Sequence, residues 1–206
     1  MKKLTIFDFD GTIVDVWKRY YQIFCDYWEI DHIKLKEYKE LKRQYPNDDE
    51  LVKSLGLDSL RLISYKDHKR SMLESIYYLR FDSLLVSSTD LQKFFINNNS
   101  LVITVRRDKQ AYYSQLKWLG LDFIAPKTVL LNPSATDVKV NWVKRYLPES
   151  DITVIGDSET DLAFTEMNNC RVYFVKTGLR SYEKMIERWS GFETIENAQI
   201  FLEKTF

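Results

Sequence analysis

The chain has 206 residues, 45% of them apolar, and its 30 basic residues balance its 30 acidic ones. A chain of this length can bury one sizeable core, as one domain with an insertion or as two small domains. No long block of one charge occurs, which argues against a nucleic-acid binder or a basic membrane surface and favours a small-molecule partner.

The cellular setting can be inferred from cysteines and apolar runs. Cys25 and Cys170 are too few for a disulfide framework, so a reducing compartment is expected. The apolar run at the N-terminus is interrupted by Asp8 and Asp10, and nothing approaches the ~20 apolar residues that span a bilayer. We expect a cytoplasmic protein that binds neither membranes nor nucleic acid; its oligomeric state is left open.

The first notable stretch is an apolar segment, Leu4 to Phe7, followed directly by DFDGT. In an extended chain Asp8 and Asp10 point the same way, and two like charges held close raise one pKa unless a cation lies between them. A divalent metal is therefore predicted. The alternative is that Asp10-Gly11 forms a simple hairpin turn between two apolar strands.

Residues 15 to 82 are predicted to form helices. Aromatic residues recur there at intervals of three and four, which indicates one apolar helix face, and plain core packing is the expected role of that face. The stripe consists of Trp17, Tyr20, Tyr21, Phe24, Tyr27 and Trp28. Further helices are expected over Ile33 to Tyr45, from Asn47 to Gly56 and over Tyr65 to Leu79. The segment Tyr45 to Leu57 is a candidate specificity loop.

From about residue 83, strands and helices alternate. The expected strands are Leu101–Thr104, Thr128–Leu131, Ile152–Ile155 and Arg171–Val175. The expected helices are Leu91–Ile96 with Thr89 or Asp90 as its cap, Lys109–Trp118, Val138–Tyr146, Leu162–Met167 and Tyr182–Trp189. Ile200–Leu202 is consistent with either a helix or a strand. This alternation predicts an α/β fold with a parallel sheet and right-handed crossovers.

Polar side chains follow three of the predicted strands. Asp8 and Asp10 follow the first, Thr104 ends the second, and Asp157 and Asp161 follow Ile152–Ile155 within GDSETD. Each alone is consistent with a turn, a helix cap or a satisfied hydroxyl. Because ligands bind at the carboxyl ends of parallel strands, their joint occurrence predicts a catalytic site at one sheet edge.

Together these segments resemble the four motifs of the haloacid dehalogenase superfamily of hydrolases. The motifs are DFDGT, a strand ending in Thr104, a later lysine, and GDSETD after a buried strand. The resemblance spans nearly the whole chain. It implies a Rossmann-like core of residues 1–14 and 83–206. The helical segment 15–82 resembles the inserted cap domain of the phosphoglycolate phosphatase type.

The resemblance implies a Mg²⁺-dependent phosphatase acting on a small phosphorylated metabolite. Asp8 resembles the family nucleophile, which forms an aspartyl-phosphate and so splits one hard displacement into two easier steps. Asp10 resembles the family acid and base, which protonates the leaving oxygen and then activates water. Asp8, Asp157 and the carbonyl of Asp10 would hold Mg²⁺, and Asp161 would hold a metal-bound water.

The resemblance also implies a phosphate-binding set. Thr104 would bind a phosphate oxygen through its hydroxyl, and the backbone amides around Phe9 would form part of the same cradle. A lysine is needed to offset the charge, and the candidates are Lys127, Lys139 and Lys144. We choose Lys139 because it begins the helix that leads to the strand before GDSETD, which is where the family places this residue.

Arg106 and Arg107 stand just past Thr104, where the family usually has a small or polar residue at Val105. One arginine could reach an anionic group of the substrate, although such residues more often pair on the surface.

Three alternatives to a phosphatase stay open. A sugar phosphomutase keeps the same motifs and differs mainly in how the cap excludes water. A phosphonate hydrolase needs a Schiff-base lysine from the cap, for which Lys36, Lys42 and Lys53 are available. A non-catalytic phosphate-binding regulatory module would have no use for both Asp8 and Asp10.

Overall fold

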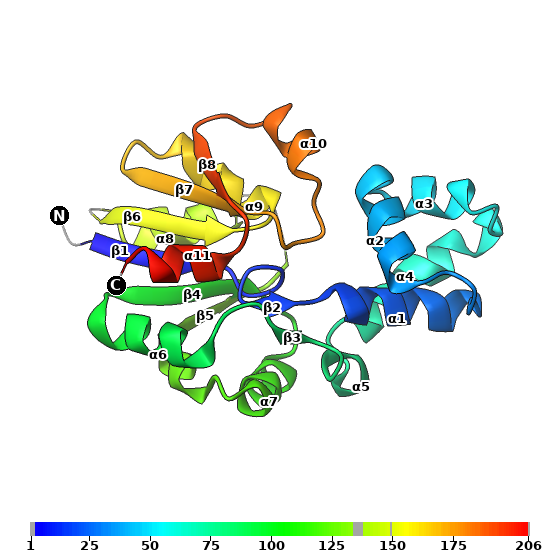
Figure 1. Ribbon diagram of the computed structural model, residues 1–206, viewed down its shortest axis with the longest axis horizontal. Helices are drawn as coiled ribbons and strands as arrows, with labels where there is room; N and C mark the ends of the chain where they lie inside the picture. Colours follow the sequence, from blue (N-terminus) through cyan, green and yellow to red (C-terminus); the bar gives the residue numbers. More distant parts are fainter. Residues whose placement is uncertain (1–2, 134–137, 149, 206) are drawn as a thin grey trace.

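The centre of the protein is a six-stranded parallel sheet, seen in a computed structural model that describes residues 3–133, 138–148 and 150–205 (Figure 1). The strand order is β5–β4–β1–β6–β7–β8, so β1 lies in the middle with β4 and β6 as its neighbours. The six strands are β1 Lys3–Phe7, β4 Ser100–Val105, β5 Thr128–Leu131, β6 Asp151–Gly156, β7 Cys170–Val175 and β8 Phe192–Ile195.

Helices cover both faces of this sheet. Phe94 and Leu116 belong to the apolar core on one face, and Val143 and Leu162 belong to the core on the other. The elements around the sheet are α6 Ser88–Asn97, α7 Lys109–Leu119, the 3-10 turn η2 Asp122–Lys127, α8 Val138–Tyr146, α9 Glu159–Leu162, η3 Ala163–Glu166, α10 Tyr182–Ile186 and α11 Ala198–Glu203. The predicted α/β class is confirmed.

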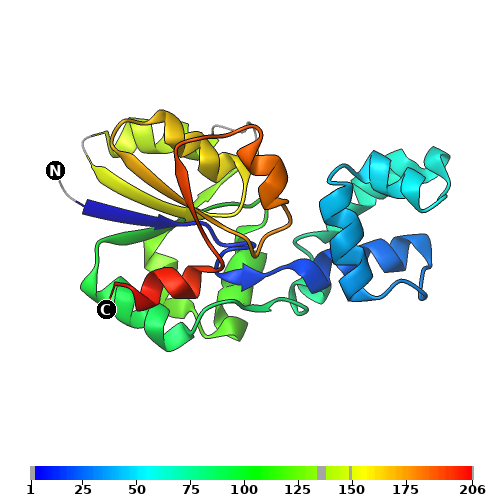
Figure 2. The ribbon, with the colours of Figure 1, turned by 45° about the horizontal axis from the view of Figure 1, so that its top comes forward.

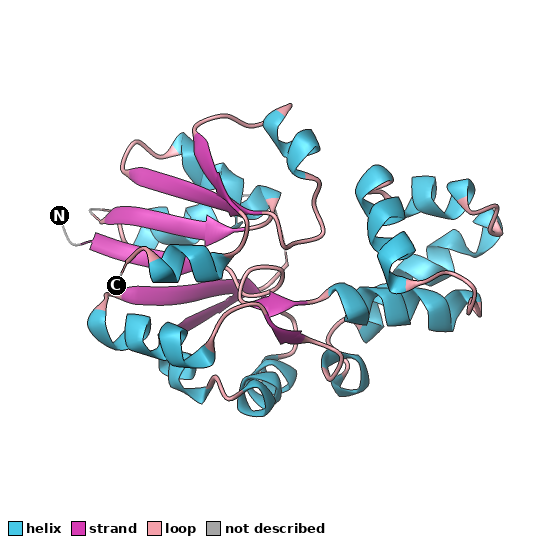
Figure 3. Cartoon of the chain, in the orientation of Figure 1, coloured by secondary structure: helices cyan, strands magenta, loops and turns pink. Residues whose placement is uncertain are grey.

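A helical unit is inserted between two short strands, β2 Val14–Asp15 and β3 Ser83–Leu84, which pair antiparallel. Its elements are α1 Trp17–Trp28, α2 Leu35–Gln44, α3 Asp48–Ser54, η1 Ser59–Arg61, α4 Leu62–Met72 and α5 Ile76–Leu79. The unit has an apolar cluster of its own, to which much of the aromatic stripe of α1 contributes. The strand arrows of the main sheet point toward it (Figures 2 and 3).

The structure corrects three expectations about helices and strands. The helix expected over Tyr65 to Leu79 is two helices, α4 and α5, and between them the Leu73 carbonyl accepts a hydrogen bond of 2.9 Å from the Arg19 guanidinium. Helix α6 is capped by Ser87, whose hydroxyl accepts from the Asp90 amide, and not by Thr89 or Asp90.

The third correction concerns the C-terminal edge of the sheet. Strand β8 was not predicted because its four residues are all partly or fully exposed at an edge, so they lack a buried apolar run. The ambiguous stretch Ile200–Leu202 lies in helix α11. Within the described part of the chain, no helix is both long and apolar enough to cross a membrane.

Candidate active site

The carboxyl ends of β1, β4 and β6 meet beneath the helical unit. In the sheet register Phe7 pairs with Val102 of β4 and with Ile155 of β6, so Asp8 follows the last paired residue of the central strand. Asp157 directly follows β6, and Thr104 lies near the end of β4. These three side chains line one pocket of about 1320 Å³ that residues of the helical unit also line. The structure thus brings together the three strand ends that the sequence singled out.

The DFDGT segment forms a tight turn and not a hairpin. The Phe9 carbonyl accepts from the amides of Ile13 and Val14 at 2.9 and 3.0 Å, and Gly11 takes a positive φ of 83°. Because Val14 pairs with β3 and not with β1, the hairpin alternative is wrong. The Phe9 carbonyl is engaged within the turn, so only its amide could contribute to a phosphate cradle.

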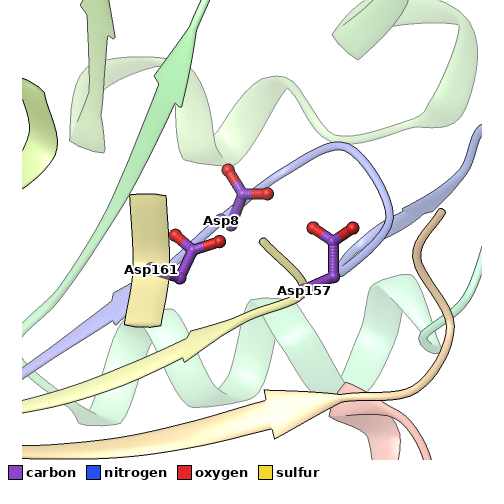
Figure 4. A group of neighbouring side chains, drawn as sticks. All are labelled: Asp8, Asp157 and Asp161. Carbon is purple, nitrogen blue, oxygen red and sulfur yellow. The ribbon is translucent and has the colours of Figure 1, made fainter. Parts of the chain in front are cut away.

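Three buried carboxylates lie close together: Asp8 and Asp157, which line the pocket, and Asp161 next to them (Figure 4). One oxygen of each lies within 4.8 Å of the others. Burial raises the pKa of Asp8 to about 6, although Lys139 opposes the shift. Burial, together with the charges of Asp8 and Asp161, also raises the pKa of Asp157. Both shifts express the cost of holding like charges in a place shielded from water.

Lys139 lies between two of these carboxylates. Its Nζ donates hydrogen bonds of 2.6 Å to Asp8 Oδ1 and to Asp161 Oδ1. Burial alone would lower the pKa of Lys139, but the neighbouring Asp161 and Asp8 raise it, so the ammonium stays charged. Of the other two candidate lysines, Lys127 donates to the Phe95 carbonyl and Lys144 is exposed on α8. Lys139 is therefore the lysine that the fold brings to Asp8.

Asp161 is held at the N-terminus of α9. Its Oδ2 accepts from the Ser158 hydroxyl at 2.6 Å and from the Ser158 amide at 3.2 Å. With Oδ1 accepting from Lys139, both oxygens of Asp161 are engaged within the protein. This arrangement suits Asp161 to orienting Lys139 better than to direct metal ligation, and any part it takes in holding a metal-bound water remains a prediction.

The residues at the strand ends fit a divalent cation. Hard oxygen donors are what Mg²⁺ prefers, and Asp8 and Asp157 supply two adjacent carboxylates. Among the described residues no lysine or arginine forms an ion pair with Asp157, so its charge is left for another cation. The backbone also leaves room for this carboxylate: a Cβ added at Gly11 would lie 2.5 Å from Asp157 Oδ2, and one at Gly178 would overlap the same oxygen.

Asp10 has a different environment from Asp8. Its Oδ1 accepts from Arg106 Nη2 at 2.7 Å and pairs with Arg19 Nη2 at 3.1 Å. Arg106 Nη2 also contacts Gln115 Oε1 at 3.1 Å, and Gln115 Nε2 donates to Asp82 Oδ2 at 2.6 Å. Asp82 Oδ1 in turn lies 3.3 Å from Arg19 Nε, which closes a ring of five polar side chains.

This ring joins the two parts of the molecule. Arg19 belongs to α1 of the helical unit and Asp82 precedes β3, whereas Arg106 and Gln115 belong to the sheet unit. Burial would raise the pKa of Asp10, but Arg106 and Arg19 hold it below its ordinary value. Burial raises the pKa of Asp82 to about 7 in spite of Arg19. The carboxylate of Asp10 is therefore a stable anion in this arrangement.

The two arginines after Thr104 lie in different environments. Arg106 is only 3% exposed and belongs to the ring, whereas Arg107 is more exposed and pairs with Glu74 at 3.6 Å. The surface pairing expected for such residues holds for Arg107 alone. Sequence reasoning also missed Arg19. The available signal was its spacing, since it lies four residues before Ile23 on the buried side of α1.

No family model matches the sequence, and no match was found among curated proteins. Solved structures do match at low identity. A haloacid dehalogenase-like hydrolase from Streptococcus pneumoniae is 14% identical with a TM-score of 0.68, and the match covers 98% of each chain. A haloacid dehalogenase family hydrolase from Deinococcus radiodurans, which carries bound phosphate and sodium, is 12% identical with a TM-score of 0.65 over 97% of this chain and 93% of that one.

A third similar structure has another activity in its name. This protein from Thermotoga maritima, described as a β-phosphoglucomutase, is 13% identical with a TM-score of 0.62 over 98% of each chain. At such identities the comparisons establish the fold and leave the reaction open. The protein has the haloacid dehalogenase-like fold that its motifs indicated, including the parallel sheet and a helical insertion.

Proposed function

We propose that this protein is a Mg²⁺-dependent phosphatase that hydrolyses a small phosphomonoester through an aspartyl-phosphate at Asp8. One observation carries the proposal: Asp8 lies in a large pocket with Lys139 on one carboxylate oxygen and Asp157 beside it. This arrangement supplies a nucleophile, a cation for phosphate and a pair of oxygen ligands for a metal. The fold, which the chain shares with a hydrolase that carries bound phosphate and sodium, supports it.

The chemistry follows from the two aspartates of DFDGT. One carboxylate oxygen of Asp8 forms a bond to phosphorus while the bond to the leaving oxygen breaks, and Asp10 gives that oxygen a proton. Water then attacks phosphorus, Asp10 takes a proton from it, and Asp8 is released with inorganic phosphate. Asp10 must loosen from a guanidinium before it can carry the first proton, because Arg106 and Arg19 keep it ionised.

The other residues act by charge and position. Lys139 offsets the charge of Asp8 and of an incoming phosphate, Thr104 offers a hydroxyl to a phosphate oxygen, and the amide of Phe9 offers a second donor. Asp8, Asp157 and the backbone carbonyl of Asp10 would hold Mg²⁺. When bound, Mg²⁺ offsets the negative charge that otherwise keeps a carboxylate away from phosphate.

We further propose that residues 1–14 and 83–206 form the catalytic core and residues 15–82 a cap. The separate apolar cluster of the helical unit supports this division. The pairing of Val14 with Leu84 also supports it, since the chain leaves and re-enters the core at that point. The cap lines the pocket above Asp8 and so would shape the substrate space.

The test is phosphate release from a broad panel of phosphorylated metabolites, with Mg²⁺ or with a chelator. We expect turnover that needs Mg²⁺ and falls at least about a thousandfold in Asp8→Asn. The matched control is Asp151→Asn, an exposed aspartate at the other end of β6 from the site. Absence of turnover on the whole panel, or an active Asp8→Asn, would contradict the proposal and favour a phosphate-binding regulatory module.

The same panel separates hydrolysis from a sugar phosphomutase reaction, which the similar structure from Thermotoga maritima makes the second candidate. A mutase would convert a sugar phosphate into its isomer and release little inorganic phosphate. We expect free phosphate to be the main product.

A further inference from the structure

The cap side of the pocket carries a cluster of charged residues that the proposed reaction does not use. Lys42 of α2 and Lys69 of α4 both line the pocket, and both bind the carboxylate of Asp48 at the start of α3. Lys42 Nζ donates to Asp48 Oδ1 and Lys69 Nζ to Asp48 Oδ2, each at 2.7 Å. Two buried or nearly buried ammonium groups thus share one carboxylate.

Lys42 and Lys69 carry two positive charges against the one negative charge of Asp48, and this imbalance matters because the groups are largely shielded from water. The side chain of Lys42 is 4% exposed and that of Lys69 is 17% exposed. Burial and the nearby Lys69 lower the pKa of Lys42 to about 8, whereas the two lysines hold the pKa of Asp48 below its ordinary value in spite of burial. Asp48 is therefore ionised, and its one negative charge balances only one of the two positive charges of Lys42 and Lys69.

The lysines also have donors to spare. An ammonium group has three N–H bonds. Within the described part of the chain, Lys42 uses two of them, on Asp48 and on the Pro46 carbonyl. Lys69 makes one hydrogen bond to the described residues, to Asp48, and lies 5.6 Å from the Tyr20 ring, which also lines the pocket. The spare donors and the surplus charge lie in the same cavity as Asp8.

We propose that Lys42 and Lys69 bind a second anionic group of the substrate, which makes the preferred substrate a phosphomonoester that also carries a carboxylate or another phosphate. This inference rests on the proposed phosphatase function and names the substrate class for it. The phosphate end would lie at Asp8 and Lys139, and the other anion would reach the cap, so one ligand would bridge both parts of the molecule. Charge-assisted hydrogen bonds in a site partly shielded from water are strong enough to favour a ligand with this second anionic group.

Binding of unreactive probes tests this without turnover. The probes are phosphonocarboxylates of increasing chain length, each compared with the alkylphosphonate of the same length, titrated calorimetrically into the full-length protein with Mg²⁺. We expect at least one phosphonocarboxylate to bind about tenfold or more tightly than its partner. Equal binding of the two series would overturn the inference and leave the phosphatase proposal intact. No binding by either series would contradict both.

Two substitutions should move this preference in opposite directions. Lys69→Gln removes a cation, so the advantage of the carboxylate should fall about tenfold, whereas Asp48→Asn removes the competing anion, so the advantage should increase. If Lys42, Lys69 and Asp48 only stabilised the fold, both Lys69→Gln and Asp48→Asn would bind the phosphonocarboxylates more weakly. That result would overturn the proposal. Lys53→Gln, on the exposed side of α3, is the matched control and should change nothing. Melting temperatures verify that each variant is folded. If a variant does not fold, the comparison of phosphonocarboxylates with alkylphosphonates in the unaltered protein still tests the proposal.

Discussion

Arg106 Nη2 donates a hydrogen bond of 2.7 Å to Asp10 Oδ1, and this pair joins the end of β4 to the DFDGT turn. Arg106 is 3% exposed, its Nη2 also donates to Gln115 Oε1, and its guanidinium lies over the rings of Phe9 and Tyr112. An ion pair of this kind is costly to break from one side, because the remaining charge is left without its partner. The proposed acid and base is thus built into a structural network and not left free in the pocket.

Replacing Arg106 should therefore destabilise the protein. We expect Arg106→Gln to lower the free energy of unfolding by about 3 kcal/mol, measured by urea denaturation at neutral pH. The matched control is the neighbouring Arg107→Gln, because Arg107 is exposed and its pair with Glu74 should contribute at most about 1 kcal/mol. Similar losses in the two variants would show that the buried ring is energetically unimportant.

The contribution of this pair should also depend on pH. The folded pKa of Asp10 lies below its ordinary value, so its stabilisation is present at neutral pH and is lost as the pH falls through the folded pKa. The unfolding free energies of the protein and of Arg106→Gln should therefore converge in strong acid. Acid unfolding monitored by circular dichroism should begin at a higher pH in the variant, and a constant difference down to the acid transition would contradict this.

Binding of Mg²⁺ should stabilise the protein more at pH 8 than at pH 5. Burial raises the pKa of Asp8 to about 6 and also raises that of Asp157, so protons compete with a cation for both carboxylates at pH 5. At about a hundred times its dissociation constant a ligand adds about 2.7 kcal/mol, or about 5–10 °C for a chain of this size. Differential scanning fluorimetry at the two pH values measures the shift.

Variants of the same strand ends control this experiment. Asp157→Asn should lose most of the Mg²⁺-dependent shift, and Asp151→Asn should keep it. Asp10→Asn should keep most of the shift as well, because its side chain contacts Arg106 and Arg19 and only its carbonyl is proposed as a ligand. A full shift in Asp157→Asn would mean that the cation binds elsewhere.

Removing Lys139 should lower the stability of the protein. Lys139→Met leaves the buried carboxylates of Asp8 and Asp161 without their common cation, so the free energy of unfolding should fall by about 3–5 kcal/mol. Mg²⁺ should recover part of that loss, since it offsets the same charges. Lys144→Met on the exposed side of α8 should stay within about 0.5 kcal/mol of the unaltered protein. Equal effects in both variants, measured in urea, would contradict the proposed role of Lys139.

Much of the fold could be predicted because local patterns determine it. The apolar runs before Asp8, Thr104 and Asp157 each indicated a buried strand, and parallel topology requires their carboxyl ends to meet at one edge. The choice of Lys139 followed from the family resemblance, which places this lysine at the start of the helix before the GDSETD strand. Each buried strand and the polar residue at its end lie close together in the sequence, so they can be recognised without knowing the tertiary structure.

The charged networks could not be predicted in the same way. Arg19 and Arg106 meet at Asp10 from elements far apart in the chain, and Lys42 and Lys69 meet at Asp48 only because α2, α3 and α4 pack together. Each of these charges is consistent with a solvated surface when considered alone. Only tertiary packing shows that they are buried and which partner each has.

The turn of DFDGT offers a last test, in which two glycines with similar backbones differ in what surrounds them. Gly11 has a φ of +83° and Gly120 a φ of +68°, so alanine is strained at both positions. A Cβ at Gly11 would lie 2.5 Å from Asp157 Oδ2, whereas nothing lies within 4 Å of one at Gly120. Gly11→Ala should therefore displace the carboxylate that we propose as a metal ligand and reduce the Mg²⁺-dependent shift in melting temperature. Gly120→Ala should lower stability by about 1–2 kcal/mol and leave that shift unchanged. If both variants retain the shift, close packing of the turn against Asp157 is not what positions the cation.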